Sequence, residues 1–464
     1  MRIHFNGAAQ TVTGSQHLLE INGHRLLLEC GMYQGRREDT YKVNLNFPFK
    51  PSEIDAIILS HAHIDHSGNL PNLVKQGCNA PIYATEPTVE LAKIMLLDSG
   101  RIQEADAQFV NKKRARKGQP PVDPLYTEED AEAALAFFRE VDYDQPFEPI
   151  PGVTVSLVEA GHILGSAAVV LDIEEKGRKV RLWFSGDIGR PPLPLMRDPV
   201  LPQNADYLMM ECTYGDKPHR HPEEAYIEFR QVMQRTIARG GKVIIPAFSV
   251  GRTQELVFFL NRMHAEEAIP PIPVYVDSPL AVNATDIYRK YACLFDEETR
   301  AFVESGKHPA LNFPSLVYTR SVDESKAINE KKGPLVIISA SGMAENGRIL
   351  HHLRNNIEDP KNTILIVSWQ APHTLGRRLA ERQRNVRIFG EEFTCRAEIQ
   401  TIGGLSAHAG QDFLTQYALA AKASAREIYL VHGEPAAAGI FQDKLREVGI
   451  ANITYPELNE RVEI

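Results

Sequence analysis

Runs of apolar residues, some alternating with polar ones and some continuous, predict that the first part of the chain is rich in short strands. Residues 16–21 and 25–29 are expected to form a hairpin, because the Asn22-Gly23 pair between them is typical of a type I′ turn. The segment 54–60 carries adjacent isoleucines and predicts a buried strand that leads into a loop. Three more strands are expected at 153–158, 167–173 and 179–185.

Helical patterns occur beside these strands and become regular in the middle of the chain. Helices are expected at 86–118 and 127–140, and prolines 120, 121 and 124 separate them. The second helix begins with Thr127-Glu128-Glu129-Asp130, a typical N-terminal cap. Farther on, alternation predicts parallel βαβ units: strands at 242–248, 273–277, 334–340 and 363–368, and helices at 252–264, 283–292 and 347–356.

Beyond about residue 400 the pattern returns to that of the first part, with a buried strand at 428–431. This return indicates one domain inserted within another. We therefore expect an outer domain formed by residues 1–215 and 399–464, and an inserted domain formed by residues 216–398.

The composition is that of an ordinary globular protein, with 43% hydrophobic and 24% charged residues among 464. No apolar run is long enough for a membrane helix, and the N-terminus lacks the apolar core of a signal peptide. The 5 cysteines are far apart and form no CxxC pair. A reducing, cytoplasmic location and no membrane partner are expected.

The net charge of −9 argues against a polyanionic substrate, but the charge is uneven. Residues 101–120 carry six Lys and Arg against Glu104 and Asp106, and residues 376–396 carry six arginines against three glutamates. Either cluster is consistent with a phosphate-binding surface or with a solvated helix face, and neither decides between these alternatives.

The strand at 54–60 is followed at once by His61, His63, Asp65 and His66. Imidazole and carboxylate are preferred ligands of zinc and similar divalent ions. Four such groups on one loop do not reach a single ion comfortably, so the spacing indicates two neighbouring metals. The alternative, scattered polar residues on a solvated loop, is the weaker explanation of so dense a pattern.

Three further ligand-type side chains follow predicted strands: His162, Asp187 and His432. Strand ends on one edge of a sheet converge in space, so these loops are expected to build one site. His61, His63 and His162 would hold one ion. A second ion would be held by Asp65, His66 and His432, and Asp187 would bridge the two ions. Singly, His162 or His432 is more often an ordinary polar residue, and Asp187 a turn former.

With these residues in place, the chain resembles the metallo-β-lactamase superfamily, and more narrowly its β-CASP branch of nucleic-acid hydrolases. It is similar over essentially its whole length to bacterial and archaeal relatives of the endonuclease subunit of the cleavage and polyadenylation complex. Six of the seven residues above, all but His432, match the superfamily motifs. The three β-CASP motifs match Glu211, His408 and His432. Glu29 stands where the family has an aspartate that orients ligands. The appended RNA-binding domains of some relatives are not expected in this chain.

The resemblance implies an α/β fold, a metallo-β-lactamase αββα sandwich split by an inserted β-CASP domain with a mainly parallel sheet. It implies a zinc-dependent ribonuclease that uses a hydroxide bridged by two zinc ions, although manganese would satisfy the same ligands. The substrate would be single-stranded RNA, cut internally to leave 5′-phosphate and 3′-hydroxyl ends. Asp65 would hold the nucleophile, His408 would act as general acid, and Glu211 would orient His408.

Two segments of the inserted domain are candidates for contacts with the substrate backbone. Ser249 and Arg252 lie between a predicted strand and helix, where amides and a helix N-terminus suit an anion, and Ser341 and Gly342 have the same placement. Strand-to-helix turns also use Gly and Ser for geometry alone. His351, His352 and His373 match no family ligand position.

Three other functions compete with this reading. A small-molecule ester or thioester hydrolase would share the fold, but the inserted domain favours a groove for a single strand. A degenerate scaffold subunit would have lost ligands, whereas every ligand position is filled. The resemblance disfavours a DNA nuclease, because DNA-repair members of the branch tend to lack a histidine at the third β-CASP position, where this chain has His432. A homodimer or an RNA-processing partner remains open, as does the choice between endonuclease and 5′-exonuclease.

Overall fold

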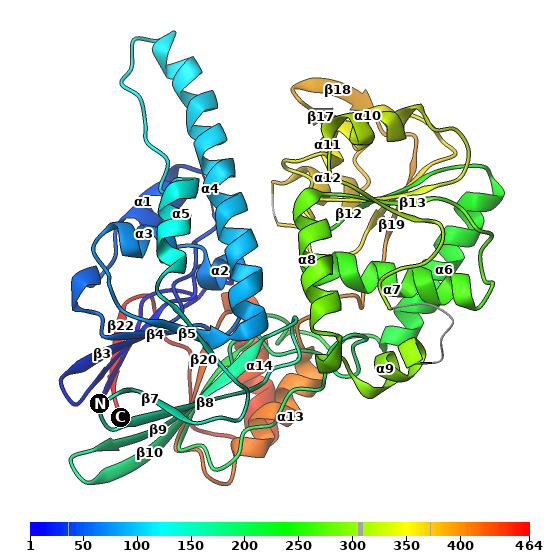
Figure 1. Cartoon of the computed structure of the whole chain (residues 1–464). Coiled ribbons are helices and arrows are strands. Elements are labelled where there is room, and N and C mark those ends of the chain that lie inside the picture. The colour runs from blue at the N-terminus through cyan, green and yellow to red at the C-terminus, as the bar shows by residue number, and fades with distance from the viewer. Residues whose placement is uncertain (36, 305–309, 372) are drawn as a thin grey trace. The chain divides into compact units, whose positions relative to one another are not determined.

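The computed structural model describes residues 1–35, 37–304, 310–371 and 373–464, which form two compact units (Figure 1). The first unit comprises Met1–Pro191, Asp198–Pro218 and His408–Ile464. The second comprises Pro192–Arg197 and His219–Ala407.

The first unit contains two seven-stranded sheets. One has the order β22-β1-β2-β3-β4-β5-β6, with strands β1 Arg2–Phe5, β2 His17–Ile21, β3 His24–Leu28, β4 Ala56–Ile58, β5 Ile82–Thr85, β6 Phe138–Val141 and β22 Glu460–Glu463. The other has the order β21-β20-β11-β10-β9-β8-β7, with strands β7 Phe147–Ile150, β8 Val153–Glu159, β9 Ala167–Glu175, β10 Arg178–Phe184, β11 Tyr207–Glu211, β20 Glu427–Val431 and β21 Ile453–Thr454.

The inner faces of these sheets pack on each other through side chains such as Leu19, Ile58 and Leu171. Helices cover the outer faces (Figure 1). On the side of the first sheet they are α1 Arg37–Leu45, α2 Ile64–Ser67, α3 Leu70–Lys75, α4 Glu86–Ala115 and α5 Glu128–Leu135, and on the second α13 Gln411–Ala421 and α14 Pro435–Glu447. The unit is therefore the expected αββα sandwich.

The second unit is built on a six-stranded sheet in which every pairing is parallel. Its order is β14-β13-β15-β12-β16-β19, with strands β12 Val243–Pro246, β13 Val274–Asp277, β14 Leu316–Thr319, β15 Val336–Ser339, β16 Thr363–Ile366 and β19 Glu398–Thr401. The connecting helices are α6 Pro222–Ala238, α7 Arg252–Ala265, α8 Pro279–Lys290, α9 Glu297–Glu304, α10 Val322–Glu330, α11 Ile349–Asn356 and α12 Leu375–Ala380. The predicted βαβ alternation is confirmed, and the predicted domain boundary after residue 398 falls within β19.

The predicted turn at Asn22-Gly23 and the predicted helix start at Thr127 were confirmed, whereas one predicted helix end was wrong. Asn22 and Gly23 both have positive φ, as a type I′ turn requires, and Thr127 forms a capping box with Asp130. The helix predicted over 127–140 is wrong beyond Leu135, because residues 138–141 form β6 and pair in parallel with β5. Burial of Phe138 against the sheet outweighs helix propensity there.

No helix among the described residues has the length and apolarity needed to span a bilayer. All five cysteines are free thiols, and three of them are buried.

Candidate metal centre

Four loops of the first unit, each following a strand, deliver the predicted ligands to one place. His61 follows β4, His162 follows β8, Asp187 follows β10 and His432 follows β20. The first of these loops runs directly into helix α2, with His63 at the N-cap of the helix and Asp65 and His66 within it. Both sheets therefore contribute to a single site, as strand-end loops are expected to do.

Glycines allow these loops to approach one another closely. A Cβ at Gly31 would lie 1.6 Å from the carbonyl oxygen of Asp65, and one at Gly189 would lie 2.0 Å from that of Gly161. Neither distance is compatible with any side chain. The two glycines therefore fix the packing of the His61–His66 loop and of the loop that carries Asp187.

Three histidine nitrogens form the first group of candidate ligands. His61 Nε2 lies 3.1 Å from His63 Nδ1, which lies 3.2 Å from His162 Nε2. One oxygen of Asp187, Oδ2, is 3.4 Å from the Nε2 atoms of both His61 and His162.

The second group gathers around the other oxygen of Asp187. His66 Nε2 lies 3.2 Å from Asp187 Oδ1 and 3.2 Å from His432 Nε2. His432 Nε2 in turn lies 3.5 Å from Asp65 Oδ2. Asp187 is thus placed between the two groups, and its buried Oδ1 accepts no hydrogen bond from the described residues.

The charge states of these side chains suit cation binding. Burial and neighbouring imidazoles lower the pKa of His63 to about 3 and hold the pKa of His162 well below its usual value, so both rings are neutral ligands. Burial alone would raise the pKa of Asp187, but the adjacent His432 and His66 hold it well below its usual range. The neutral rings of His63 and His162, beside a buried carboxylate with an unsatisfied oxygen, fit a divalent metal.

A second layer of side chains orients the ligands. Glu29 accepts a hydrogen bond from His66 Nδ1 at 2.7 Å, which leaves Nε2 for a metal. Ser60 donates to Glu29 and lies 2.9 Å from His61 Nδ1. Thr213 Oγ1 lies 3.1 Å from His432 Nδ1. The sequence argument missed Ser60 and Thr213, although each lies within two residues of a motif residue.

His408 and Glu211 form a pair beside these groups. His408 Nδ1 lies 3.0 Å from Glu211 Oε1 and 3.8 Å from Asp187 Oδ2. Glu211 is fully buried and is held by the backbone N–H of Ile188 at 2.7 Å, whereas 22% of the His408 side chain is exposed. Burial lowers the pKa of His408, but the carboxylates of Glu211 and Asp187 outweigh burial and raise it to about 9.

The four predicted substrate-binding residues lie in the second unit, after the adjacent parallel strands β12 and β15. Ser249 Oγ is 3.2 Å from Ser278 Oγ, and buried Arg252 forms an ion pair with Glu255. Ser341 Oγ accepts from the N–H of Glu345 at 3.2 Å, and Gly342 packs on the ring of Phe248. The charge of Arg252 is already compensated, so hydroxyls and amides are the better anion donors at this edge.

The histidines set aside from the ligand set have other surroundings. His352 Nε2 lies 2.6 Å from Asp277 Oδ2, in a buried network that Thr319, Ser325 and Arg348 complete. His351 packs against Phe389, and His373 is exposed. Among the described residues, none of the three histidines belongs to a group that could hold a metal.

The network around Asp277 predicts a stability effect. Burial opposes ionisation of Asp277, but bonds from His352, Ser325, Thr319 and Arg348 lower its pKa. Asp277→Asn is therefore expected to reduce the free energy of unfolding by about 3 kcal/mol at neutral pH, since it removes the buried negative charge that pairs with Arg348 and accepts these hydrogen bonds. Because the folded pKa is depressed, this difference should shrink as the pH falls below about 4.

Urea unfolding followed by circular dichroism would measure the effect. Asp286→Asn is a matched control, because the Asp286 side chain is 52% exposed in its pairs with Arg289 and Arg320. Its expected cost is below about 1 kcal/mol. Equal losses in the two variants would show that the Asp277 network does not stabilise the fold.

Comparison with known protein families covers most of the chain. Residues 18–180 match the metallo-beta-lactamase superfamily domain, residues 253–379 match the Beta-Casp domain, and residues 394–456 match the Zn-dependent metallo-hydrolase RNA specificity domain. Together with the side-chain clusters, these matches indicate a divalent metal.

Similar proteins extend over nearly the full chain. Ribonuclease TTHA0252 of Thermus thermophilus is 38% identical over 94% of this chain and 93% of its own length. Transcription termination factor FttA of Methanocaldococcus jannaschii is 30% identical over 99% of this chain and 71% of its own. A crystal structure of a protein of unknown function from Enterococcus faecalis V583 aligns with a TM-score of 0.55 and 13% identity over 99% of both chains, which supports the fold alone.

Proposed function

Because this chain belongs to the β-CASP branch of the metallo-β-lactamase superfamily, we propose that it is a metal-dependent ribonuclease that cuts single-stranded RNA internally. The observation that carries the proposal is the placement of Asp187 between two histidine groups, with His408 at 3.8 Å. A bridging carboxylate beside a protonated imidazole suits hydrolysis of a phosphodiester. The names of the related ribonuclease and termination factor support RNA as the substrate.

The donor set supports two zinc ions, with manganese as the alternative. One ion would be held by His61, His63 and His162. The other would be held by Asp65, His66 and His432, and Asp187 would contribute to both. Ions bound by these residues would lower the pKa of water and would neutralise charge on the phosphoryl oxygens. The rest of the chemistry falls to side chains of this chain.

Asp65 and His408 have complementary roles in the proposed reaction. Asp65, whose side chain is 26% exposed, accepts a hydrogen bond from the attacking water and orients it toward phosphorus. His408 keeps its Nδ1 on Glu211, so its Nε2–H donates the proton that the departing 3′-oxygen requires. The water oxygen forms the new bond to phosphorus and loses one proton to solvent, while the bond to the 3′-oxygen breaks and that oxygen takes the proton from His408. The products are therefore a 5′-phosphate and a 3′-hydroxyl.

The deciding experiment incubates purified protein with single-stranded RNA, and with DNA of the same sequence, after elemental analysis for bound metal. Labelling the RNA at its 5′ end in one reaction and its 3′ end in another distinguishes internal cuts from stepwise removal of nucleotides. Two zinc ions per chain and internal RNA fragments with 5′-phosphates are expected. Cleavage of DNA alone, or of neither nucleic acid, would contradict the proposal.

A further inference from the structure

One half of helix α4 takes no part in the core of the first unit. The helix spans 30 residues, and its buried positions all lie between Pro87 and Gly100. The half that begins at Arg101 extends beyond the two sheets of its unit, and the chain returns along it to α5 (Figure 1). We call residues 101–127 the arm.

The arm is a braced structure. The side chain of Asn111 donates to the carbonyl of Val122 at 2.9 Å and accepts from its N–H at 2.8 Å. Arg114 Nε donates to the carbonyl of Pro120 at 2.6 Å. At the base, Tyr126 donates to Ser99 Oγ at 2.7 Å. These bonds hold the return segment against the helix, so the tip has a defined position.

The tip of the arm is strongly basic. Residues 112–117 read Lys-Lys-Arg-Ala-Arg-Lys, in a chain whose net charge is −9. Among the residues that the structure describes, no carboxylate forms an ion pair with Lys112, Lys113, Arg116 or Lys117, and all four are exposed. One or two cations near a helix C-terminus are explained by the helix dipole, which acts over a single turn. Five like charges within six residues repel one another, and binding of an anionic ligand would relieve this repulsion.

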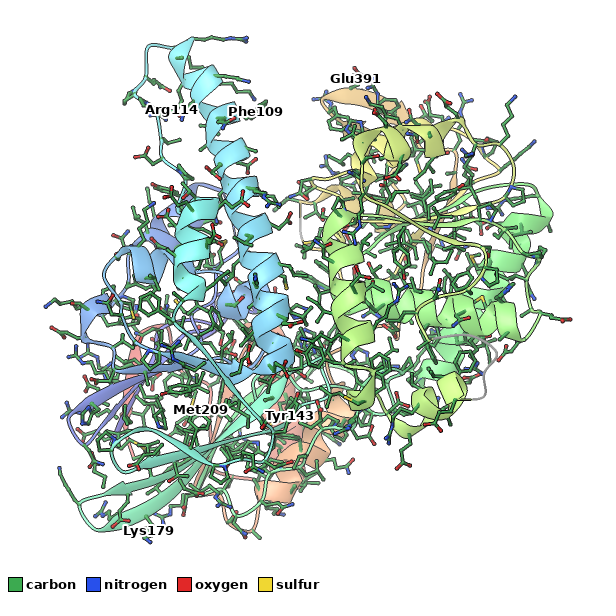
Figure 2. All side chains as sticks on the ribbon, in the orientation of Figure 1. Phe109, Arg114, Tyr143, Lys179, Met209 and Glu391 are labelled. Carbon is green, nitrogen blue, oxygen red and sulfur yellow. The ribbon has the colours of Figure 1, made fainter. Side chains whose placement is uncertain are left out.

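An exposed aromatic ring accompanies these cations. Phe109 is 54% exposed, and the ammonium of Lys113 lies 4.3 Å from the centre of its ring. Figure 2 labels Phe109 and Arg114 on this end of the helix. Cations that follow a phosphate backbone, combined with a ring on which a base can stack, are the combination used to bind single-stranded nucleic acid.

The other end of α4 contacts a loop that contributes a ligand to the candidate metal centre. Thr85 and Thr88 donate to the carbonyl of Gly165 at 2.6 and 2.7 Å, in the loop that carries His162. From Thr88 to Arg114 the helix rises by about 40 Å at ~1.5 Å per residue. That distance corresponds to about 12 nucleotides at the ~3.4 Å spacing of a stacked strand.

We propose that the arm binds the phosphate backbone of single-stranded RNA about a dozen nucleotides from the scissile bond, an inference that rests on the proposed function for the identity of the nucleic acid. The arm adds affinity for long substrates. Short substrates reach the metal centre without contacting the arm.

The test compares binding and cleavage of fluorescein-labelled U30 and U8 by the full chain. The arm variant carries Lys112→Gln, Lys113→Gln, Arg116→Gln and Lys117→Gln, and glutamine preserves helix propensity. The control variant neutralises four exposed cations elsewhere in the same unit, with Lys42→Gln, Lys176→Gln, Arg178→Gln and Lys179→Gln. Binding is measured by fluorescence anisotropy in an Asp187→Asn background, and cleavage with Asp187 intact.

The arm variant should bind U30 at least about 10-fold more weakly at low salt, with a slope of log Kd against log salt reduced by about 3. Its kcat/KM on U8 should be unchanged, and the control variant should match the parent on both RNAs. Equal U30 binding by the arm variant and the parent would overturn the proposal, and would point to an acidic protein as the occupant. If the parent binds U30 through the arm but cleaves no RNA, the proposed function fails and the arm is still supported.

Discussion

Asp187→Asn is expected to reduce RNA cleavage by about 10³-fold or more, with the fold intact and less metal bound. The two oxygens of Asp187 face different histidine groups, Oδ2 at 3.4 Å from His61 and His162 and Oδ1 at 3.2 Å from His66. Asparagine has the same shape but no charge. The loss corresponds to several kcal/mol of transition-state stabilisation, and each 1.4 kcal/mol is a factor of ten.

The measurement combines initial rates on labelled RNA with elemental analysis and circular dichroism of the same samples. Asp172→Asn is a matched control, since Asp172 lies on β9 of the same unit and its side chain is 50% exposed in a pair with Arg181. That substitution should leave the rate and the metal content unchanged. If the Asp187→Asn protein retains two metals and also the parental rate, Asp187 is required neither for metal binding nor for catalysis.

The ligand-bearing loops were predictable from the sequence because their signals are local. Each of His61, His162, Asp187 and His432 stands directly after a run of apolar residues that forms a strand. Strand ends converge at sheet edges whatever the rest of the sequence does. A loop of this kind can therefore be assigned to a site before the fold is known, and the structure does bring these four side chains together.

Two of the residues that orient the ligands, Ser60 and Thr213, were not predictable, because tertiary contacts select them. Nothing in the sequence distinguishes Ser60 or Thr213 from any other hydroxyl beside a strand. Their roles depend on Glu29, which lies 31 positions from Ser60, and on His432, which lies 219 positions from Thr213. Such partners come within hydrogen-bonding distance only when strands distant in the sequence pair in one sheet, as β3 does with β4 and β11 does with β20.

Helix α4 shows a similar limit of prediction from sequence. The sequence predicted a helix over 86–118, and the structure has one from Glu86 to Ala115. Its apolar residues continue past the core, however, with Ile102 43% exposed and Phe109 54% exposed. Periodicity identifies a helix but not the point at which it leaves its sheet. The exposed half of the helix, and so the arm, was visible only in three dimensions.

His408→Gln is expected to lower kcat by about 10²- to 10⁴-fold while metal content and RNA affinity stay unchanged. His408 is a partly exposed imidazole beside the buried Asp187, and Nδ1 of His408 lies 3.0 Å from Glu211. Glutamine fills a similar volume and retains a hydrogen-bonding side chain, but it supplies no acid. The two histidine groups assigned to the metals do not include His408, so the loss should appear in kcat alone. A ligand role, which the clustering of His408 with Asp187 and Glu211 would allow, would instead lower the metal content.

A modified substrate separates this role from a structural one. In RNA whose scissile 3′-oxygen is replaced by sulfur, the leaving thiolate needs no proton, so the His408→Gln protein should cleave it nearly as fast as the parent does. Glu211→Gln should lose less activity than His408→Gln on ordinary RNA, since the imidazole remains and only the charge that favours its protonated form is removed. If the His408→Gln protein instead loses metal, His408 acts as a ligand. If the variant cleaves the sulfur-substituted RNA no faster than ordinary RNA, the proton must come from another group.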